Sequence, residues 1–148
     1  MANNTEVWIP KLASEWNTKF EKLDDGITWA IDVPFKLSDD KFRYQWVYVS
    51  YGVGVAKGKD MYDIRSKVGD YSSKLDVQGI LQESKFAFYS TVCIREVKRE
   101  GNSVDVVHVQ AGPLADYVTD FELFRLILEE VASNADIMEE KFYGVDKF

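Results

Sequence analysis

Residues 86–112, FAFYSTVCIREVKREGNSVDVVHVQAG, contain two strand-like stretches separated only by the short polar segment KREGN. β-Branched and aromatic residues dominate both stretches, and Gly101 supplies the backbone freedom that a tight turn needs. We therefore expect an antiparallel hairpin in which Cys93 lies nearly opposite His108. In the same register, Tyr89 shares the outer face of the hairpin with Cys93 and His108.

The segment that follows the hairpin predicts a long helix. Residues 119–122, TDFE, match a capping box that begins at Thr119. The apolar residues beyond it recur at spacings of three and four, which predicts one buried stripe: Phe121, Phe124, Leu128, Val131, Ala135, Met138 and Phe142. The acidic residues are expected to face water: Glu129, Glu130, Asp136, Glu139 and Glu140.

The first half of the chain predicts one helix, three strands and a second, short helix. Hydrophobic periodicity and turn residues place these elements: a helix at 10–23, strands at 27–35, 43–54 and 60–68, and a short helix within 72–84. The order α-β-β-β-α-β-β-α predicts a single α+β domain over residues 1–148. We expect an antiparallel sheet of about five strands with helices packed on one face.

The strand at residues 43–54 carries the main candidate binding residues. Tyr44, Trp46 and Tyr48 share one of its faces, and the opposite face is also apolar. If a helix covers the aromatic face, these side chains belong to the core. If no helix covers it, they form an exposed patch of the kind that marks contacts with proteins or ligands. Tyr89 and His108, on the outer face of the hairpin, are the next candidates.

Composition narrows the class of partner. The 148 residues include 18 Lys and Arg against 25 Asp and Glu, for a net charge of -7, and 46% are hydrophobic. Such a surface disfavours nucleic acids and anionic membranes. Cys93 is the single cysteine, which excludes an internal disulfide and suits a reducing compartment. We see no secretory signal and no apolar run long enough to span a membrane, so a cytoplasmic location is expected.

Three candidate chemical motifs fail on spacing or context. The stretch YGVGVAKGK, residues 51–59, lacks the glycine spacing and the Ser or Thr of a phosphate-binding loop, and a strand is expected after it. Cys93 and His108 could form a thiolate–imidazole pair, but nothing nearby in the sequence would orient it. The acidic pairs at 24–25, 39–40 and 139–140 fall in turns or on a solvated helix face. We expect no catalytic residue, no cofactor and no metal site.

Several segments resemble one known family in their order and local texture. They are MYDIRSKVGDYSSKLDVQGILQES, the hairpin strands FAFYSTVCIREV and SVDVVHVQAGPLADYV, and FELFRLILEEVASNADIMEEKF. From Ile27 to Phe142 the chain is similar to the YbjN-type family of bacterial sensory transduction regulators, within the type III secretion chaperone-like fold. The resemblance implies a small acidic cytoplasmic protein that binds other polypeptides, often as a homodimer. It supplies no catalytic residue.

These observations support a non-enzymatic protein-binding module, chaperone-like or regulatory, as the first hypothesis. The second is a carrier of a small apolar ligand, with a pocket between the sheet and the C-terminal helix. The third is an enzyme whose reactive centre is assembled from dispersed carboxylates or from Cys93 and His108.

Overall fold

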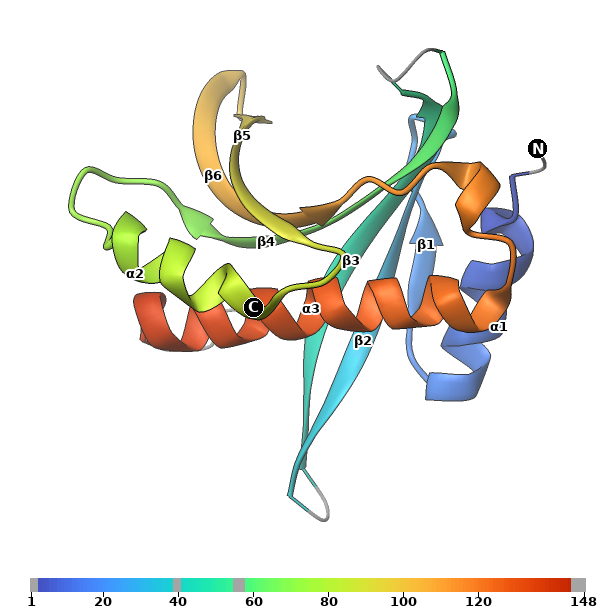
Figure 1. Ribbon diagram of the computed structural model, residues 1–148, viewed down its shortest axis with the longest axis horizontal. Helices are drawn as coiled ribbons and strands as arrows, with labels where there is room; N and C mark the ends of the chain where they lie inside the picture. Colours follow the sequence, from blue (N-terminus) through green and yellow to red (C-terminus); the bar gives the residue numbers. More distant parts are fainter. Residues whose placement is uncertain (1–2, 39–40, 55–57, 145–148) are drawn as a thin grey trace.

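The computed structural model describes residues 3–38, 41–54 and 58–144, and it shows a bent sheet with helices on one side (Figure 1). Within these residues, six strands form one antiparallel sheet in the order β1-β2-β3-β4-β6-β5. The strands are β1 (Phe20–Lys22), β2 (Thr28–Ser38), β3 (Lys41–Val53), β4 (Asp60–Asp70), β5 (Thr91–Arg99) and β6 (Asn102–Ala111). The helices are α1 (Thr5–Trp16), α2 (Val77–Glu83) and α3 (Phe121–Tyr143), with 3₁₀ turns η1 (Ser84–Phe86) and η2 (Ala115–Tyr117). The expected α+β class is confirmed, with six strands in place of five.

The extra strand arises where the sequence pattern predicts the end of a helix. α1 ends at Trp16 because Asn17 takes the left-handed conformation, with φ 54° and ψ 49°. The chain then turns back, and Phe20 pairs with Ile31 of β2. The prediction of a helix over 10–23 is therefore wrong in its second half. Its start is also earlier, since Asn3 Oδ1 accepts the Thr5 N–H at 3.0 Å.

α3 lies across the sheet and supplies the centre of the core (Figure 1). Its predicted stripe is confirmed, because Phe124, Leu128 and Val131 are fully buried. They belong to the same apolar cluster as Ile64 and Val109 of the sheet. Full burial of side chains of this kind contributes about 1.5–3 kcal/mol each. Packing against one sheet face therefore accounts for the position of this helix.

The polar side of α3 differs from the prediction in two places. Asp136, expected in water, is only 7% exposed, and its carboxylate accepts hydrogen bonds from Nε (2.8 Å) and Nη2 of Arg43. Glu139 is also buried. The helix begins one residue later than predicted, because Asp120 rather than Thr119 is the N-cap, accepting the Leu123 N–H at 2.8 Å.

The hairpin that the sequence predicts is present in the expected register. Cys93 pairs with His108, and the turn lies at Glu100 and Gly101, whose φ angles are 52° and 81°. Both positive angles fit the tight two-residue turns that match strand twist. The first strand is shorter than predicted, since β5 begins at Thr91. Tyr89 therefore lies in the preceding loop and does not face the same way as His108.

The glycine-rich stretch 51–59 connects β3 to β4, although residues 55–57 lie outside the described residues. The Gly54 N–H donates to the Lys59 carbonyl at 2.7 Å, so the two ends of the connection meet. A strand, rather than a helix, follows at Asp60. The expectation of a hairpin connection is confirmed here, and residues 51–54 and 58–59 offer no helix N-terminus to a phosphate.

Candidate interaction surface

The sheet has one face covered by helices and one face without a helix among the described residues, and we call the latter the open face. Strand alternation places Tyr44, Trp46 and Tyr48 of β3 on it, while Val47 and Val49 point into the core. Tyr44 is 45% exposed, and the other two aromatic side chains are half-buried. This decides between the two alternatives left by the sequence. The aromatic row does not lie under a helix.

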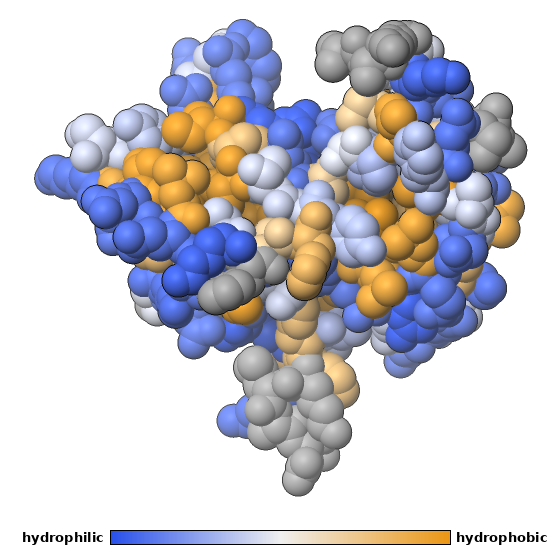
Figure 2. Space-filling view, in the orientation of Figure 1, coloured by the Kyte–Doolittle hydropathy of each residue, from blue (hydrophilic) through white to orange (hydrophobic). Residues whose placement is uncertain are grey.

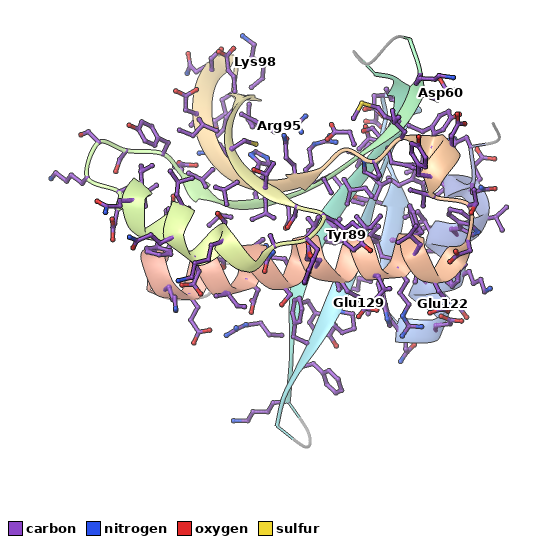
Figure 3. All side chains as sticks on the ribbon, viewed as in Figure 1. Asp60, Tyr89, Arg95, Lys98, Glu122 and Glu129 are labelled. Atoms are coloured by element: carbon purple, nitrogen blue, oxygen red, sulfur yellow. The ribbon has the colours of Figure 1, made fainter. Side chains whose placement is uncertain are left out.

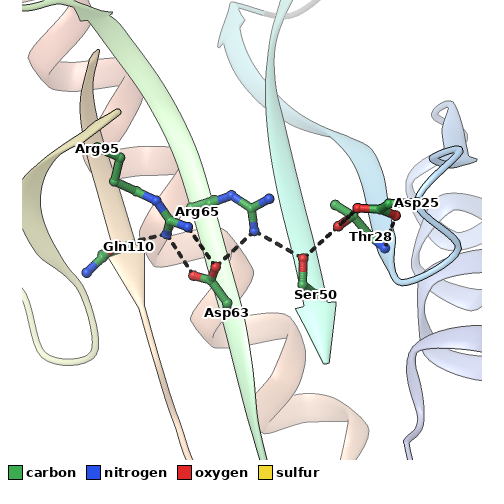
Figure 4. Close-up of polar contacts among 7 residues, drawn as sticks. All are labelled: Asp25, Thr28, Ser50, Asp63, Arg65, Arg95 and Gln110. Atoms are coloured by element: carbon green, nitrogen blue, oxygen red, sulfur yellow. Dashed lines mark hydrogen bonds and ion pairs between the residues drawn. The ribbon is translucent and has the colours of Figure 1, made fainter. Parts of the chain in front are cut away.

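A ladder of polar side chains crosses the open face beside this row (Figure 4). The Thr28 and Ser50 hydroxyls are 2.8 Å apart, and Arg65 Nη1 donates to Ser50 Oγ at 3.2 Å. Arg65 also donates to Asp63 at 3.1 Å. Arg95 donates to both Asp63 oxygens at 2.9 Å and to a Gln110 side-chain oxygen at 3.0 Å. The ladder therefore joins β2, β3, β4, β6 and β5 at the surface.

The electrostatics of the ladder centre on Asp63, which two guanidinium groups share. Burial alone raises the pKa of this carboxyl, but Arg95 and Arg65 outweigh it, so the pKa is lowered. Burial lowers the pKa of Arg65, with Arg95 acting in the same direction and Asp63 opposing it. The Asp63 carboxyl is therefore ionised, and its hydrogen-bonding capacity is largely used by Arg65 and Arg95.

Two hollows lie on the open face, side by side. The charged hollow has a volume of about 280 Å³ and is lined by Tyr48, Arg65, Lys67, Arg95 and His108, with Leu23, Glu96 and Val97 at its border. The aromatic hollow, of about 100 Å³, is lined by Trp46, Tyr48, Lys67, Arg99 and Val106, among others. Tyr48 and Lys67 line both, so the two hollows adjoin each other at these side chains.

His108 lies at the floor of the charged hollow and is only 2% exposed. Its Nδ1 is 3.0 Å from the Val106 carbonyl oxygen, so the neutral ring carries its proton on Nδ1. Burial lowers the pKa of His108, the Val106 carbonyl opposes this, and Arg95, Lys67 and Arg65 add to the lowering. As a contact residue for a partner, His108 offers little surface.

Cys93 lies opposite His108, as predicted, but its environment does not favour a thiolate. Burial raises the pKa of the Cys93 thiol, with Arg95 opposing and Asp63 reinforcing the rise. Reactive cysteines have a lowered pKa. This geometry does not support the hypothesis of a Cys93–His108 nucleophile.

Tyr89 lies apart from the other predicted contact residues, next to α3 (Figure 3). The N–H groups of Phe88, Tyr89 and Ser90 donate to the Glu130 carboxylate of α3 at 2.7–2.9 Å. Tyr89 borders a groove of about 630 Å³ on the helix-covered side, shared with Trp16, Phe35, Phe42 and Leu126. The expectation that Tyr89 and His108 form one surface is therefore wrong.

A second surface, unforeseen from the sequence, lies where α2 meets the sheet edge. Figure 2 shows an apolar area on the left, between α2 and the β5–β6 hairpin. We call it the edge patch, and its exposed residues are Tyr71, Val77, Leu81 and Ile94. It surrounds an apolar pocket of about 220 Å³. Leu81 is 55% exposed, whereas Ile80 beside it is buried.

Tyr48 and His108 of the charged hollow were predicted as contact residues, but its cationic residues were missed, although the sequence contains a signal for them. In β4 the charged residues Asp63, Arg65 and Lys67 alternate with buried Ile64 and Ser66. Such alternation indicates a strand with one face outside the core. Arg95 of β5 joins them only through the strand order, which brings β6 and β5 next to β4.

No protein-family model matches this chain, and no curated protein or solved structure matches it at the significance required. The resemblance to the YbjN-type family and to the chaperone-like fold therefore stays a prediction. In the part of the chain that the structure describes, no helix is both long and apolar enough to cross a membrane. The same residues contain no group of three or more His, Cys, Asp or Glu side chains placed to hold a metal ion.

Proposed function

We propose that this protein is a non-enzymatic binding module for an extended segment of another polypeptide, which lies along the open face. The observation that carries the proposal is the row of Tyr44, Trp46 and Tyr48 on a sheet face that no described helix covers. Tyrosine and tryptophan are the residues most enriched at binding hot spots. They keep a large rigid contact area in place at a low cost in entropy.

The two hollows beside the row support an extended ligand rather than a compact one. The two hollows adjoin each other, and neither by itself reaches the volume that usually encloses a whole small ligand. An extended segment can bury side chains in both while its backbone stays near the surface. A chaperone-like or regulatory role in the cytoplasm, as the family resemblance implies, is part of this proposal.

Replacing Trp46 tests the proposal. Selection of random short peptides displayed on phage should enrich ligands for the wild-type protein. Trp46→Ala should weaken their binding by roughly 30-fold, the size of a hot-spot loss. Phe88→Ala is the matched control, because Phe88 is 91% exposed on the helix-covered side and should leave binding unchanged.

Three outcomes would contradict the proposed function. The first is a selection that enriches no peptide above background, and the second is a Trp46→Ala protein that binds the selected peptides as tightly as the wild type does. If the circular dichroism spectrum and urea midpoint instead show that Trp46→Ala is unfolded, Trp46 is a structural residue and the surface is wrongly assigned.

We also propose that the protein forms a homodimer, in which the edge patch is the surface of self-association. β5 ends the strand order and has no strand on its outer side among the described residues. An unpaired strand edge next to exposed Val77, Leu81 and Ile94 can pair with the same edge of a second copy about a two-fold axis. Sedimentation equilibrium checks this directly, since a chain of 17.0 kDa that stays monomeric at high concentration has no such interface.

A small apolar ligand is the second candidate, and one observation favours it. The apolar pocket between α2 and the hairpin is lined by Leu75, Ile80, Val92 and Val107. The space under α3, where a carrier was expected to hold its ligand, is instead filled by buried side chains. Native mass spectrometry of the purified protein separates the two candidates, since a carrier retains a bound mass.

A further inference from the structure

The open face combines a charged hollow and an aromatic row, and the cations of the hollow are not equally paired. Arg65, Lys67 and Arg95 line it, together with the exposed Glu96. Asp63 is held by both arginines, and Asp25 also acts on Arg65. Asp70 acts on Lys67 through space but is hydrogen-bonded to Arg99. One cation of the hollow is therefore left without an ion pair, on a protein whose net charge is -7.

That cation is Lys67. Its ammonium lies 5.5 Å from the centre of the Tyr48 ring, and the structure gives it no hydrogen bond or ion pair. It projects from the middle of β4, opposite His108, where it lines both hollows. An ammonium in this position can donate to an incoming anion without giving up a partner in the protein.

The surroundings of Lys67 make the hollow favourable for a negative group. The three cations act together on the buried His108, whose pKa they lower after the larger effect of burial. Arg65 and Arg95 also repel each other, which adds to the lowering of the Arg65 pKa. A carboxylate entering the hollow relieves this repulsion. Elsewhere the net negative charge of the protein disfavours acidic ligands, so an acidic ligand is expected to bind at the hollow rather than at another part of the surface.

The aromatic row fixes the shape of the ligand. Tyr44, Trp46 and Tyr48 are spaced two residues apart on one strand, so the row spans about 13 Å from the edge of the charged hollow. An extended peptide covers this length with four or five residues, roughly. Its side chains alternate, and every second one faces the sheet.

We propose that the open face recognises an extended acidic peptide, in which an Asp or Glu carboxylate binds at Lys67 between Arg65 and Arg95 and apolar side chains two and four residues away pack on Trp46 and Tyr44. This inference rests on the proposed function and specifies its partner. Arg65 and Arg95 are held in place by Asp63, and Lys67 forms the new ion pair with the carboxylate of the peptide.

The test is the sequence composition of peptides that the protein selects. Random short peptides on phage are selected in parallel against the wild type, Lys67→Glu and Lys74→Glu. The wild type should enrich Asp and Glu beside aromatic or aliphatic residues. Lys67→Glu should lose this enrichment and favour Lys or Arg at the same place. Lys74→Glu makes the same change of charge in an exposed turn away from both hollows and should select as the wild type does.

Synthetic peptides then give the size of the effect. The best acidic peptide should lose about tenfold in affinity when its Asp and Glu are replaced by Asn and Gln, as expected for one charged contact. Lys67→Met keeps the aliphatic stem and should cost the same factor for the acidic peptide and nothing for the amide version. Lys67→Met also tests the role of the Lys67 charge if the Lys67→Glu protein does not fold.

Each failure has a separate meaning. If the wild type enriches peptides without an excess of Asp and Glu, or if Lys67→Met leaves the affinity for acidic peptides unchanged, the acidic partner is wrong while the proposed function stands. If no peptide is enriched above the unselected library, both are wrong.

Discussion

The two faces of β4 differ sharply although they are built from alternating residues of one strand. Tyr62, Ile64 and Val68 point to α3 and are fully buried, whereas Arg65 and Lys67 point to the open face and are half-buried. The covered face is apolar and holds the fold together by excluding water. The open face holds charged groups that neighbours only partly neutralise. The contrast separates the face that forms the core from the face on which we propose that a partner binds.

The open face and the edge patch show a second contrast. The open face carries charged and aromatic side chains, whose contacts with a ligand depend on orientation. Such contacts suit recognition of a specific sequence. The edge patch is apolar and adjoins the unpaired β5, which suits pairing with an identical edge. This difference is why we propose a polypeptide partner for the open face and a second copy of the chain for the edge patch.

The largest expected effect comes from removing a residue on the covered face. Ile64→Ala leaves a cavity under α3 and should lower the free energy of unfolding by about 3 kcal/mol. Lys67→Met, three residues further along the same strand and on the opposite face, should change it by less than about 1 kcal/mol. Urea denaturation of both variants measures the difference. Equal losses would mean that the open face is also a structural element.

An intermediate effect is expected at Gly69, where β4 carries a bulge opposite β6. A Cβ atom at this position would overlap the Tyr143 ring of α3, so Gly69→Ala displaces this ring from its place against the sheet. We expect a loss of about 1–3 kcal/mol. Gly52→Ala is the control, since no atom lies within 4 Å of the added methyl group. The prediction fails if thermal unfolding of the two alanine variants is indistinguishable.

The sequence predicts the type and the faces of individual strands and helices well, but it predicts poorly which faces pack together. Particular residues show why. Alternation gives the faces of β3, and Gly101 gives the register that pairs Cys93 with His108. Which face of β3 receives the helices could not be predicted, because both are apolar. The burial of Asp136 depends on Arg43, which is 93 residues away in the chain. No local pattern contains that information.

The candidate site has the same limits. The aromatic row was identified from β3 alone, but the charged hollow needs Lys67 of β4, His108 of β6 and Arg95 of β5 to be neighbours. The β1 strand was missed because the apolar spacing of α1 continues past Asn17, and a left-handed backbone is not visible in that spacing. Long-range strand order, more than element type, is what the sequence leaves undetermined.

The smallest expected effect is the response of the open face to pH, which His108 reports. The pKa of this group is lowered from 6.5 by burial first and then by Arg95, Lys67 and Arg65, while the Val106 carbonyl opposes the shift. The unfolded chain therefore takes up the proton at a higher pH than the folded protein does. Stability should be complete above about pH 6.5 and fall as the pH drops below it, by at most about 1.4 kcal/mol per pH unit from this group.

Nuclear magnetic resonance of the single histidine tests the cause, because its ring proton shift can be followed without assignment of the rest of the chain. The measured pKa should lie below 6.5 in the wild type and rise in Lys67→Met, since one of the three cations that disfavour the imidazolium is removed. Lys74→Met removes the same charge far from His108 and should leave the value unchanged. A pKa at or above 6.5 in the wild type would mean that the hollow is not positive. The two sheet faces would then not differ in their electrostatics in the way described above.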